Sequence, residues 1–226
     1  MNSKHNWNRK HCCSSGALDA NTTAYRNTAV GFDALGANTT GEENTAVGRF
    51  ALQSNTTAHQ NTAVGRNALK DNTTGAQNTA VGVNALENNS TASNNTAVGW
   101  FALDANTTGD ENVAVGHEAL RNNTTGQENT ALGQSALVTN TTGEYNVAVG
   151  QDALFTNNAN HNTAMGVNAL YYNSTGTKNI SIGNYSLQSN TTGGNNVAVG
   201  YGALFVNTTA SNNTAIGYNA LVANTT

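Results

Sequence analysis

Apolar residues return along this chain at a fixed spacing, without the helical stripes or long runs of an ordinary globular protein. A segment Asn-Thr-Ala-Val-Gly is followed, after two variable residues, by Ala-Leu. It recurs every 17 residues from Asn27 to Asn213, with one 16-residue interval between Asn146 and Asn162. The consensus is N-[TVI]-[AS]-[VILM]-G-x-x-A-L-x-x-N-T-T-G-x-x, numbered here as positions 1 to 17, with Asn27 at position 1. Twelve copies of this segment make the chain a tandem repeat.

The length of the unit predicts its secondary structure. Seventeen residues are too few for the two helices of a helical repeat, and Asn, Gly and Thr are poor helix formers. Two short strands with two turns fit, with coils stacked about 4.8 Å apart. The deletion in the short unit falls in the Asn-Thr-Thr-Gly segment, and turns tolerate deletions. We therefore expect an all-β parallel β-solenoid, or β-roll, of about thirteen coils, with Thr-Thr-Gly at a turn.

The repeat register divides the chain into three segments. Residues 1–9 form a polar N-terminal tail, 10–26 a degenerate first coil, and 27–226 the tandem repeats. In the first coil Cys12 and Cys13 occupy the Ala and Val positions, where reduced cysteines act as small apolar residues. Atypical terminal repeats serve as caps in solenoids, and we expect this role for the first coil.

The interior is expected to contain the Val of position 4 and the Leu of position 9. The asparagines of positions 1 and 12 are expected to stack and to hydrogen-bond along the axis, as in cross-β ladders. The Gly of position 5 is expected at a corner that requires positive φ or close backbone approach. The first core residues on this reading are Val30, Leu35, Val47, Leu52, Val64 and Leu69.

Composition narrows the possible partners. Only 10% of the residues are charged, the net charge is −4, and after Asp152 the single formal charge belongs to Lys178. Without clustered Lys and Arg we expect no nucleic-acid partner, and without a long apolar run we expect no membrane insertion and see no signal peptide. So neutral a surface is expected to be covered by neighbouring chains or attached groups.

Catalytic chemistry finds no support in the sequence. The five histidines fall at unrelated repeat positions, no nucleophile–base pair recurs, and no phosphate-binding loop is present. The calcium-binding G-G-x-G-x-D pattern of β-rolls is also missing from the sequence. We expect neither enzyme activity nor a cofactor or metal ion.

The Asn-Thr-Thr turn raises three alternatives. It matches the N-x-[ST] acceptor of N-glycosylation, whereas Asn can equally serve there as a turn and stacking residue. The paired threonines are candidates for O-linked sugar, and a threonine array suggests ice binding, although adjacent threonines on a strand point to opposite faces. The candidate modification sites are Asn38, Asn55, Asn72, Asn106, Asn140, Thr39, Thr40, Thr56 and Thr57.

Position 10 changes from polar to apolar along the chain. Stacked one per coil, its apolar members would form a stripe, interrupted by Gln188. A contiguous apolar stripe indicates an interface; the alternative is a locally wider core. The stripe comprises Val138, Phe155, Tyr171, Phe205 and Val222.

The segments Ala29–Ala34 and Ala215–Ala220 resemble the A-[IV]-G-x-x-[SA] repeat in the heads of trimeric autotransporter adhesins. They are also similar to the N-T-A-[VI]-G-x-x-A-L repeats of phage tail-fibre-like proteins and of surface proteins from aquatic bacteria. The resemblance covers about residues 10–226 and implies a left-handed parallel β-roll that assembles as a trimer.

From the repeat and this resemblance we expect a structural fibre or adhesin element. Its place would be an extracellular filament or the surface of a virion or cell, and its partners copies of itself, as a filament or a trimer. Glycans or host-surface carbohydrate are further candidate partners, and a carbohydrate- or ice-binding module is the alternative function. Because the sequence stops in register at Thr226 without a cap, end-to-end assembly is also expected.

Overall fold

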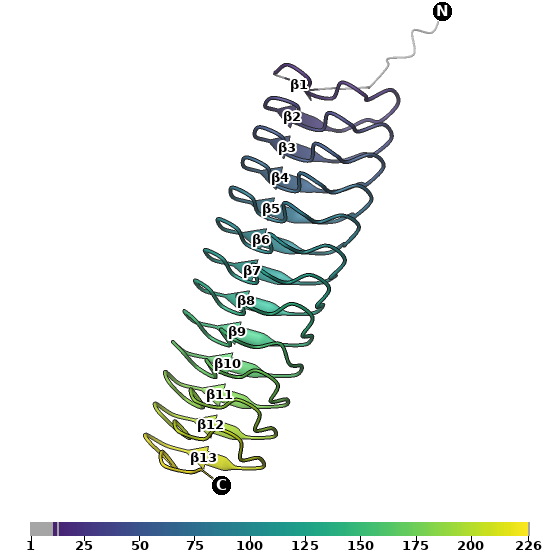
Figure 1. Cartoon of the computed structure of the whole chain (residues 1–226). Helices are drawn as coiled ribbons and strands as arrows, with labels where there is room; N and C mark the ends of the chain where they lie inside the picture. The colour runs from purple at the N-terminus through teal and green to yellow at the C-terminus, as the bar shows by residue number, and fades with distance from the viewer. Residues whose placement is uncertain (1–10, 13, 226) are drawn as a thin grey trace, which may run out of the picture.

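The chain folds as a rod of stacked coils, shown in Figure 1 by a computed structural model that describes residues 11–12 and 14–225. Each coil contributes one short strand to a single parallel sheet, in which the spatial order of the strands follows the sequence. The described residues contain no α-helix, and so none that could cross a membrane. The strands are β1 (His11–Cys12), β2 (Thr28–Val30), β3 (Thr45–Val47), β4 (Thr62–Val64), β5 (Thr79–Val81), β6 (Thr96–Val98), β7 (Val113–Val115), β8 (Thr130–Leu132), β9 (Val147–Val149), β10 (Thr163–Met165), β11 (Ile180–Ile182), β12 (Val197–Val199) and β13 (Thr214–Ile216).

The register of the sheet is the register of the repeat. Each strand pairs like with like, so that Thr28 lies beside Thr45 and Ala29 beside Ala46. Strands β2 to β12 begin eleven complete coils over residues 27–212, while β1 and β13 belong to partial coils. The expected count of about thirteen was therefore slightly high. Cys12 pairs with Ala29, which confirms its register; Cys13 and residues 1–10 lie outside the described residues.

The Ala-Leu half of the repeat is a run of turns, and the expected second strand is absent from every described coil. The amide of Ala34 donates to the carbonyl of Gly31 (3.2 Å), and the amide of Gly36 donates to that of Asp33 (3.3 Å). Asp33 and Leu35 have φ of 58° and 52°, as the third residue of a type II turn requires. Positive φ twice within three residues excludes a strand here, although amides of this segment still bond to the next coil.

Half of the expected core is correct and half is wrong. The position-9 residues Leu35, Leu52 and Leu69 are fully buried, whereas the position-4 residues Val30, Val47 and Val64 are 39%, 37% and 37% exposed. The reason is strand alternation, because successive side chains point to opposite faces. The strand turns its small Ala of position 3 inward, as at Ala29, and its neighbours at positions 2 and 4 must then face outward.

Two asparagine ladders run through the interior and confirm the expected stacks. At position 12, Asn55 Nδ2 donates to Asn38 Oδ1 (2.8 Å), while Asn38 Nδ2 donates to the carbonyl of Gly41 (3.0 Å). At position 1, the backbone amide of Asn44 donates to Asn27 Oδ1 (2.9 Å), and Asn27 Nδ2 also bonds to Gly41 (2.7 Å). Buried amides of this kind are tolerated because, apart from Asn140 Oδ1, their side-chain donors and acceptors find partners.

The position-5 glycines lie where backbones of successive coils come closest. Gly31 has φ of 137°, and a Cβ added to it would overlap the carbonyl oxygen of Gly48 in the next coil. The same overlap repeats at Gly48 against Gly65. Both expected reasons for glycine, positive φ and close approach, are thus confirmed at this corner.

The 16-residue coil interrupts one ladder. Asn140 is fully buried, and its Oδ1 has no hydrogen-bond partner. In other coils the corresponding oxygen accepts from the side-chain amide of position 12 in the next coil, but here Asn157 at that position does not donate to it. Asn158 compensates on the outside of the turn, where its Oδ1 accepts the amides of Thr141 (3.0 Å) and Thr142 (2.9 Å). In other coils the backbone carbonyl of position 13 accepts these two amides. A side chain therefore replaces the deleted residue at the surface, but the interior ladder stays broken.

Candidate functional site

The outward face of the sheet is a regular surface that the sequence interpretation missed. Position 4 carries an aliphatic residue on every strand from β2 to β13, and its exposure at Val81, Val115 and Met165 is 36%, 38% and 42%. Position 2 carries Thr, Val or Ile beside it. The signal was present in the sequence, because Asn and Ala facing inward at positions 1 and 3 require positions 2 and 4 to face outward. We call this surface the strand face.

Threonines at positions 2 and 13 of the repeat differ in their hydrogen bonding. At position 13 the hydroxyl of Thr39 donates to the carbonyl of Thr56 (3.0 Å), and Thr56 donates likewise to Thr73 (3.2 Å). The position-2 hydroxyls, such as those of Thr45 and Thr62, have no partner among the described residues. Free hydroxyls thus lie on the strand face and also at position 14 of the Asn-Thr-Thr turn, as at the exposed Thr40 and Thr57.

The turn asparagines do not fit N-glycosylation of the folded rod. All five candidates are fully buried, and their side-chain amides belong to the position-12 ladder, so a glycan could not be attached without unfolding the coil. Of the two alternatives for these asparagines, the folded rod shows the turn and stacking role, in which the side-chain amide is needed inside. The residues concerned are Asn38, Asn55, Asn72, Asn106 and Asn140. The candidate threonines differ, since Thr40 and Thr57 are exposed while Thr39 and Thr56 are partly buried.

The apolar residues of position 10 lie in one column along the rod, as predicted from the repeat. Most of their side chains are buried or partly buried, so the column is not a fully open surface. Val138 is only 7% exposed, and Phe155 stacks on Tyr171 with ring centroids 4.8 Å apart. Burial raises the pKa of the Tyr171 hydroxyl. Further along the column Phe205 is partly buried and Val222 is 39% exposed.

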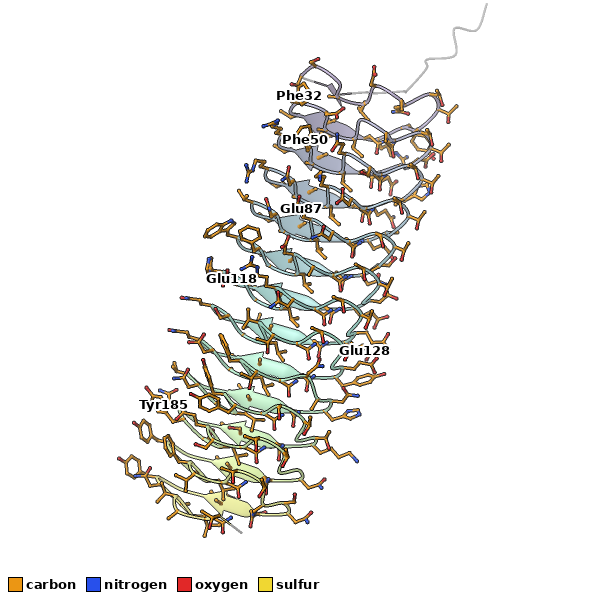
Figure 2. All side chains as sticks on the ribbon, in the orientation of Figure 1. Phe32, Phe50, Glu87, Glu118, Glu128 and Tyr185 are labelled. Carbon is orange, nitrogen blue, oxygen red and sulfur yellow. The ribbon has the colours of Figure 1, made fainter. Side chains whose placement is uncertain are left out.

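Positions 7 and 10 lie on one side of the rod, and in the first and the last coils their side chains border a shallow groove. Figure 2 shows three position-7 residues, Phe50, Glu118 and Tyr185, along this side of the rod, and Glu128 of position 17 on the opposite side. In the coils before Val138, polar bonds join positions 7 and 10, such as the ion pair of Arg121 with Glu118 (2.6 Å). The sequence interpretation did not single out position 7, because its residue type varies from coil to coil.

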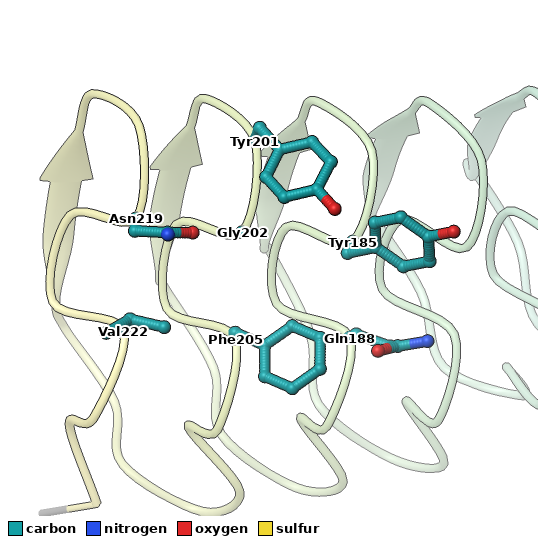
Figure 3. Close-up of a pocket in the computed structure, with 7 residues that line it drawn as sticks. All are labelled: Tyr185, Gln188, Tyr201, Gly202, Phe205, Asn219 and Val222. Atoms are coloured by element: carbon teal, nitrogen blue, oxygen red, sulfur yellow. The ribbon is translucent and has the colours of Figure 1, made fainter.

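In the last coils the groove forms an apolar hollow of about 390 Å³. Figure 3 shows the rings of Tyr185, Tyr201 and Phe205 around it, with Gln188 at one end and Asn219 at the other. Gly202 and Val222 complete the lining. We call this hollow the aromatic groove.

One carboxyl group in the polar half has a shifted pKa. Burial raises the pKa of Asp104 to about 6, the nearby Glu87 carboxylate adds to the rise, and Arg121 opposes it. Asp104 and Glu87 are both position-10 residues of adjacent coils. Burial is the main cause of the raised pKa, and repulsion between two carboxylates in one column adds to it, so Asp104 keeps its proton to a higher pH than an ordinary aspartate.

The described histidines pack or accept bonds in separate places. His59 Nδ1 accepts the amide of Glu42 (3.0 Å), and His161 stacks on Tyr145 with ring centroids 5.0 Å apart. His117 lies 5.0 Å from the ring of Trp100. Within residues 11–12 and 14–225, no three metal-ligating side chains gather in one place.

Comparison of the chain with protein-family models, with curated proteins and with solved structures gave no match.

Proposed function

We propose that this protein is a structural fibre element that assembles with copies of itself through the strand face. Its place is an extracellular filament or the surface of a virion or cell, and its role is mechanical or adhesive rather than catalytic. The observation that carries the proposal is the row of aliphatic side chains exposed at position 4 on strand after strand.

The size of this row supports self-association. Twelve strands carry it, from β2 to β13. At about 4.8 Å per strand the row is roughly 50 Å long, and a strip about 12 Å wide along it covers roughly 600 Å². Monomeric proteins rarely expose contiguous apolar patches larger than a few hundred Å². Two rods joined through this face would bury about 1,200 Å² in total, which is the lower end of the range for stable interfaces.

The absence of charge from the strand face supports the same proposal. From β2 to β13, positions 2 and 4 carry only Thr, Val, Ile, Leu and Met. Soluble β-proteins commonly block unwanted association by placing charged side chains, especially Lys, on exposed strands. This face has no such block, and flat, regular rows of methyl groups pack well against an identical surface.

Sedimentation velocity tests the proposal. The chain has a mass of 23.3 kDa, so a trimer would sediment as 3 × 23.3, or about 70 kDa, and a filament as a larger species. The double variant Val81→Lys and Val115→Lys places two charges on the strand face without touching the interior. We expect it to sediment as a folded monomer, because burying unpaired ammonium groups between rods is costly.

The matched control adds the same two charges elsewhere. Gln77→Lys and Asn94→Lys change exposed position-17 residues, and Lys178 occupies this position naturally. This control should assemble like the wild type. A wild-type chain that stays monomeric at every concentration, or a strand-face lysine variant that assembles like the wild type, would contradict the proposal.

Ice binding is a second candidate, favoured by one observation on the same face. The free position-2 hydroxyls, from Thr28 to Thr96, stand beside the position-4 methyl groups on five consecutive strands at a repeat of about 4.8 Å. A flat array of this kind could order water. A monomeric rod with thermal hysteresis that Thr62→Lys abolishes would establish this function in place of self-association.

A further inference from the structure

We propose that the aromatic groove is a binding site for a neutral oligosaccharide. The groove lies along positions 6, 7 and 10 of the last coils, whereas the strand face lies along positions 2 and 4. The two surfaces are separate, so this inference does not rest on the proposed self-association.

The shape of the groove results from a missing side chain. From β2 to β13, position 7 carries a residue with a side chain in all coils but one. The exception is Gly202, which lies between Tyr185 and Asn219 of the two adjacent coils. A Cβ on Gly202 would point at Asn219 Oδ1 and overlap it. The absence of a side chain at Gly202 leaves room in the middle of the hollow of about 390 Å³.

Aromatic rings form the walls of this space. Tyr201 is 48% exposed, meets Tyr185 edge to face with centroids 5.5 Å apart, and stacks on Tyr218 at 5.4 Å. Phe205 lines the same hollow. The rings hold one another in place, so their open faces are available without a conformational change. Preformed apolar walls of this kind reduce the entropic cost of binding.

Polar groups without partners surround the apolar walls. The side-chain amides of Gln188 and Asn219 and the hydroxyls of Tyr185 and Tyr201 make no hydrogen bond within the described residues. A few free polar groups around an apolar surface are the usual composition of a small-molecule site. A sugar ring matches this arrangement, because its faces present C–H groups and its rim presents hydroxyls that both donate and accept.

Charge narrows the class of ligand. No charged residue lines the groove, and Lys178, the only formal charge after Asp152, belongs to position 17. A phosphate or a nucleic-acid strand would need Lys or Arg beside the stacking rings, and an acidic sugar would need a cation. A neutral sugar needs only the amides and hydroxyls that are present. Because the groove spans three successive coils, from Tyr185 to Val222, it suits a chain of sugars more than a single ring.

The test starts from a glycan array of neutral and acidic oligosaccharides and continues with calorimetric titration of the neutral oligosaccharides that bind. The variant Gly202→Asn restores a side chain in the groove. Asn stands at position 7 in four other coils, at Asn67, Asn84, Asn168 and Asn219, and it tolerates the positive φ of this site. We expect Gly202→Asn to weaken binding at least about tenfold while the circular-dichroism spectrum stays unchanged.

Two further variants sharpen the result. Phe205→Val removes a ring from the groove, and the variant should also bind more weakly. Valine is tolerated at position 10, because Val222 occupies this position in the next coil. Asp152→Asn introduces the same side chain at position 7 outside the groove and should leave binding unchanged. The proposal is overturned if no neutral oligosaccharide binds, if Gly202→Asn binds like the wild type, or if a polyproline peptide binds the groove and sugars do not.

Discussion

Leu, Ala and Asn side chains share the interior of each coil, and the demands on single residues follow from that mixture. The apolar part is small, one Leu and two Ala in most coils, and the asparagine ladders supply the remaining contacts between coils. Substitutions should therefore act through backbone geometry and hydrogen bonding as much as through lost apolar contact.

Gly99→Ala tests the backbone at the position-5 corner. Gly99 has φ of 145°, and a Cβ would overlap the carbonyl oxygen of Gly116 in the next coil. We expect a loss of about 3 kcal/mol or more in the free energy of unfolding, since strain and overlap add. The matched control is Gly194→Ala, whose φ lies outside the left-handed region and whose nearest neighbour would be 3.1 Å away. Equal effects in the two variants, measured by urea denaturation, would contradict this account.

Asp104→Asn tests the raised pKa. A carboxyl whose pKa is higher in the folded state binds its proton more tightly there, so its contribution to stability is complete below pH 4 and is lost as pH rises through about 6. The full shift would correspond to about 3 kcal/mol, but Asp104 is only half-buried, and solvent screening reduces this to about 1 kcal/mol.

The variant should therefore be more stable than the wild type at pH 8 by about 1 kcal/mol, and the difference between them should shrink toward pH 4. Melting temperatures of both chains over this range measure the difference. A constant difference across the range would mean that the pKa of Asp104 is not raised.

At the scale of the coil, the repeat unit determines the register and the short coil is its one exception. Like positions pair on every described strand because each unit offers the same donors and acceptors at the same places. The deletion between β9 and β10 leaves the strands paired and breaks only the position-12 ladder at Asn140. The defect is local because the two sides of the coil bond independently.

Inserting a Thr between Asn157 and Asn158 should repair that ladder. The coil would regain 17 residues, and Asn157 could donate to the unpaired Asn140 Oδ1. We expect an increase of about 1–2 kcal/mol in the free energy of unfolding, the usual cost of a buried unsatisfied acceptor. The same insertion between Asn123 and Thr124 makes an 18-residue coil and should destabilise the rod. A destabilising effect at both sites would show that Asn158 has already compensated fully.

The sequence could predict the stacking and the glycine corner, because an exact repeat specifies which residues of successive coils meet. The turns at positions 7 and 9 were harder to predict from the sequence. Leu rarely adopts positive φ, and the Ala-Leu segment contains no residue that is typical of a turn. The prediction of a buried Val30 relied on the size of its side chain. Strand alternation starting from the buried Asn27 instead points the side chain of Val30 outward. Gly202 could have been noticed as the one gap in a column of side chains, but only the structure shows the rings around it.

For the whole molecule, the distribution of charge gives the two ends of the rod different surfaces. Formal charges are spread over the coils up to Asp152, while beyond it aromatic rings replace them in the column of positions 6, 7 and 10. The strand face, in contrast, is uniform from β2 to β13. A uniform face suits lateral contact along the full length of the rod, and a specialised end suits recognition of a ligand.

Electron cryomicroscopy of the purified protein can show whether the rods associate through the strand face. We expect particles in which two or more rods lie side by side with their strand faces turned toward one another, so that Val81 and Val115 are buried between chains. Single rods with the strand face open to solvent, or assemblies joined through any other surface, would contradict this expectation.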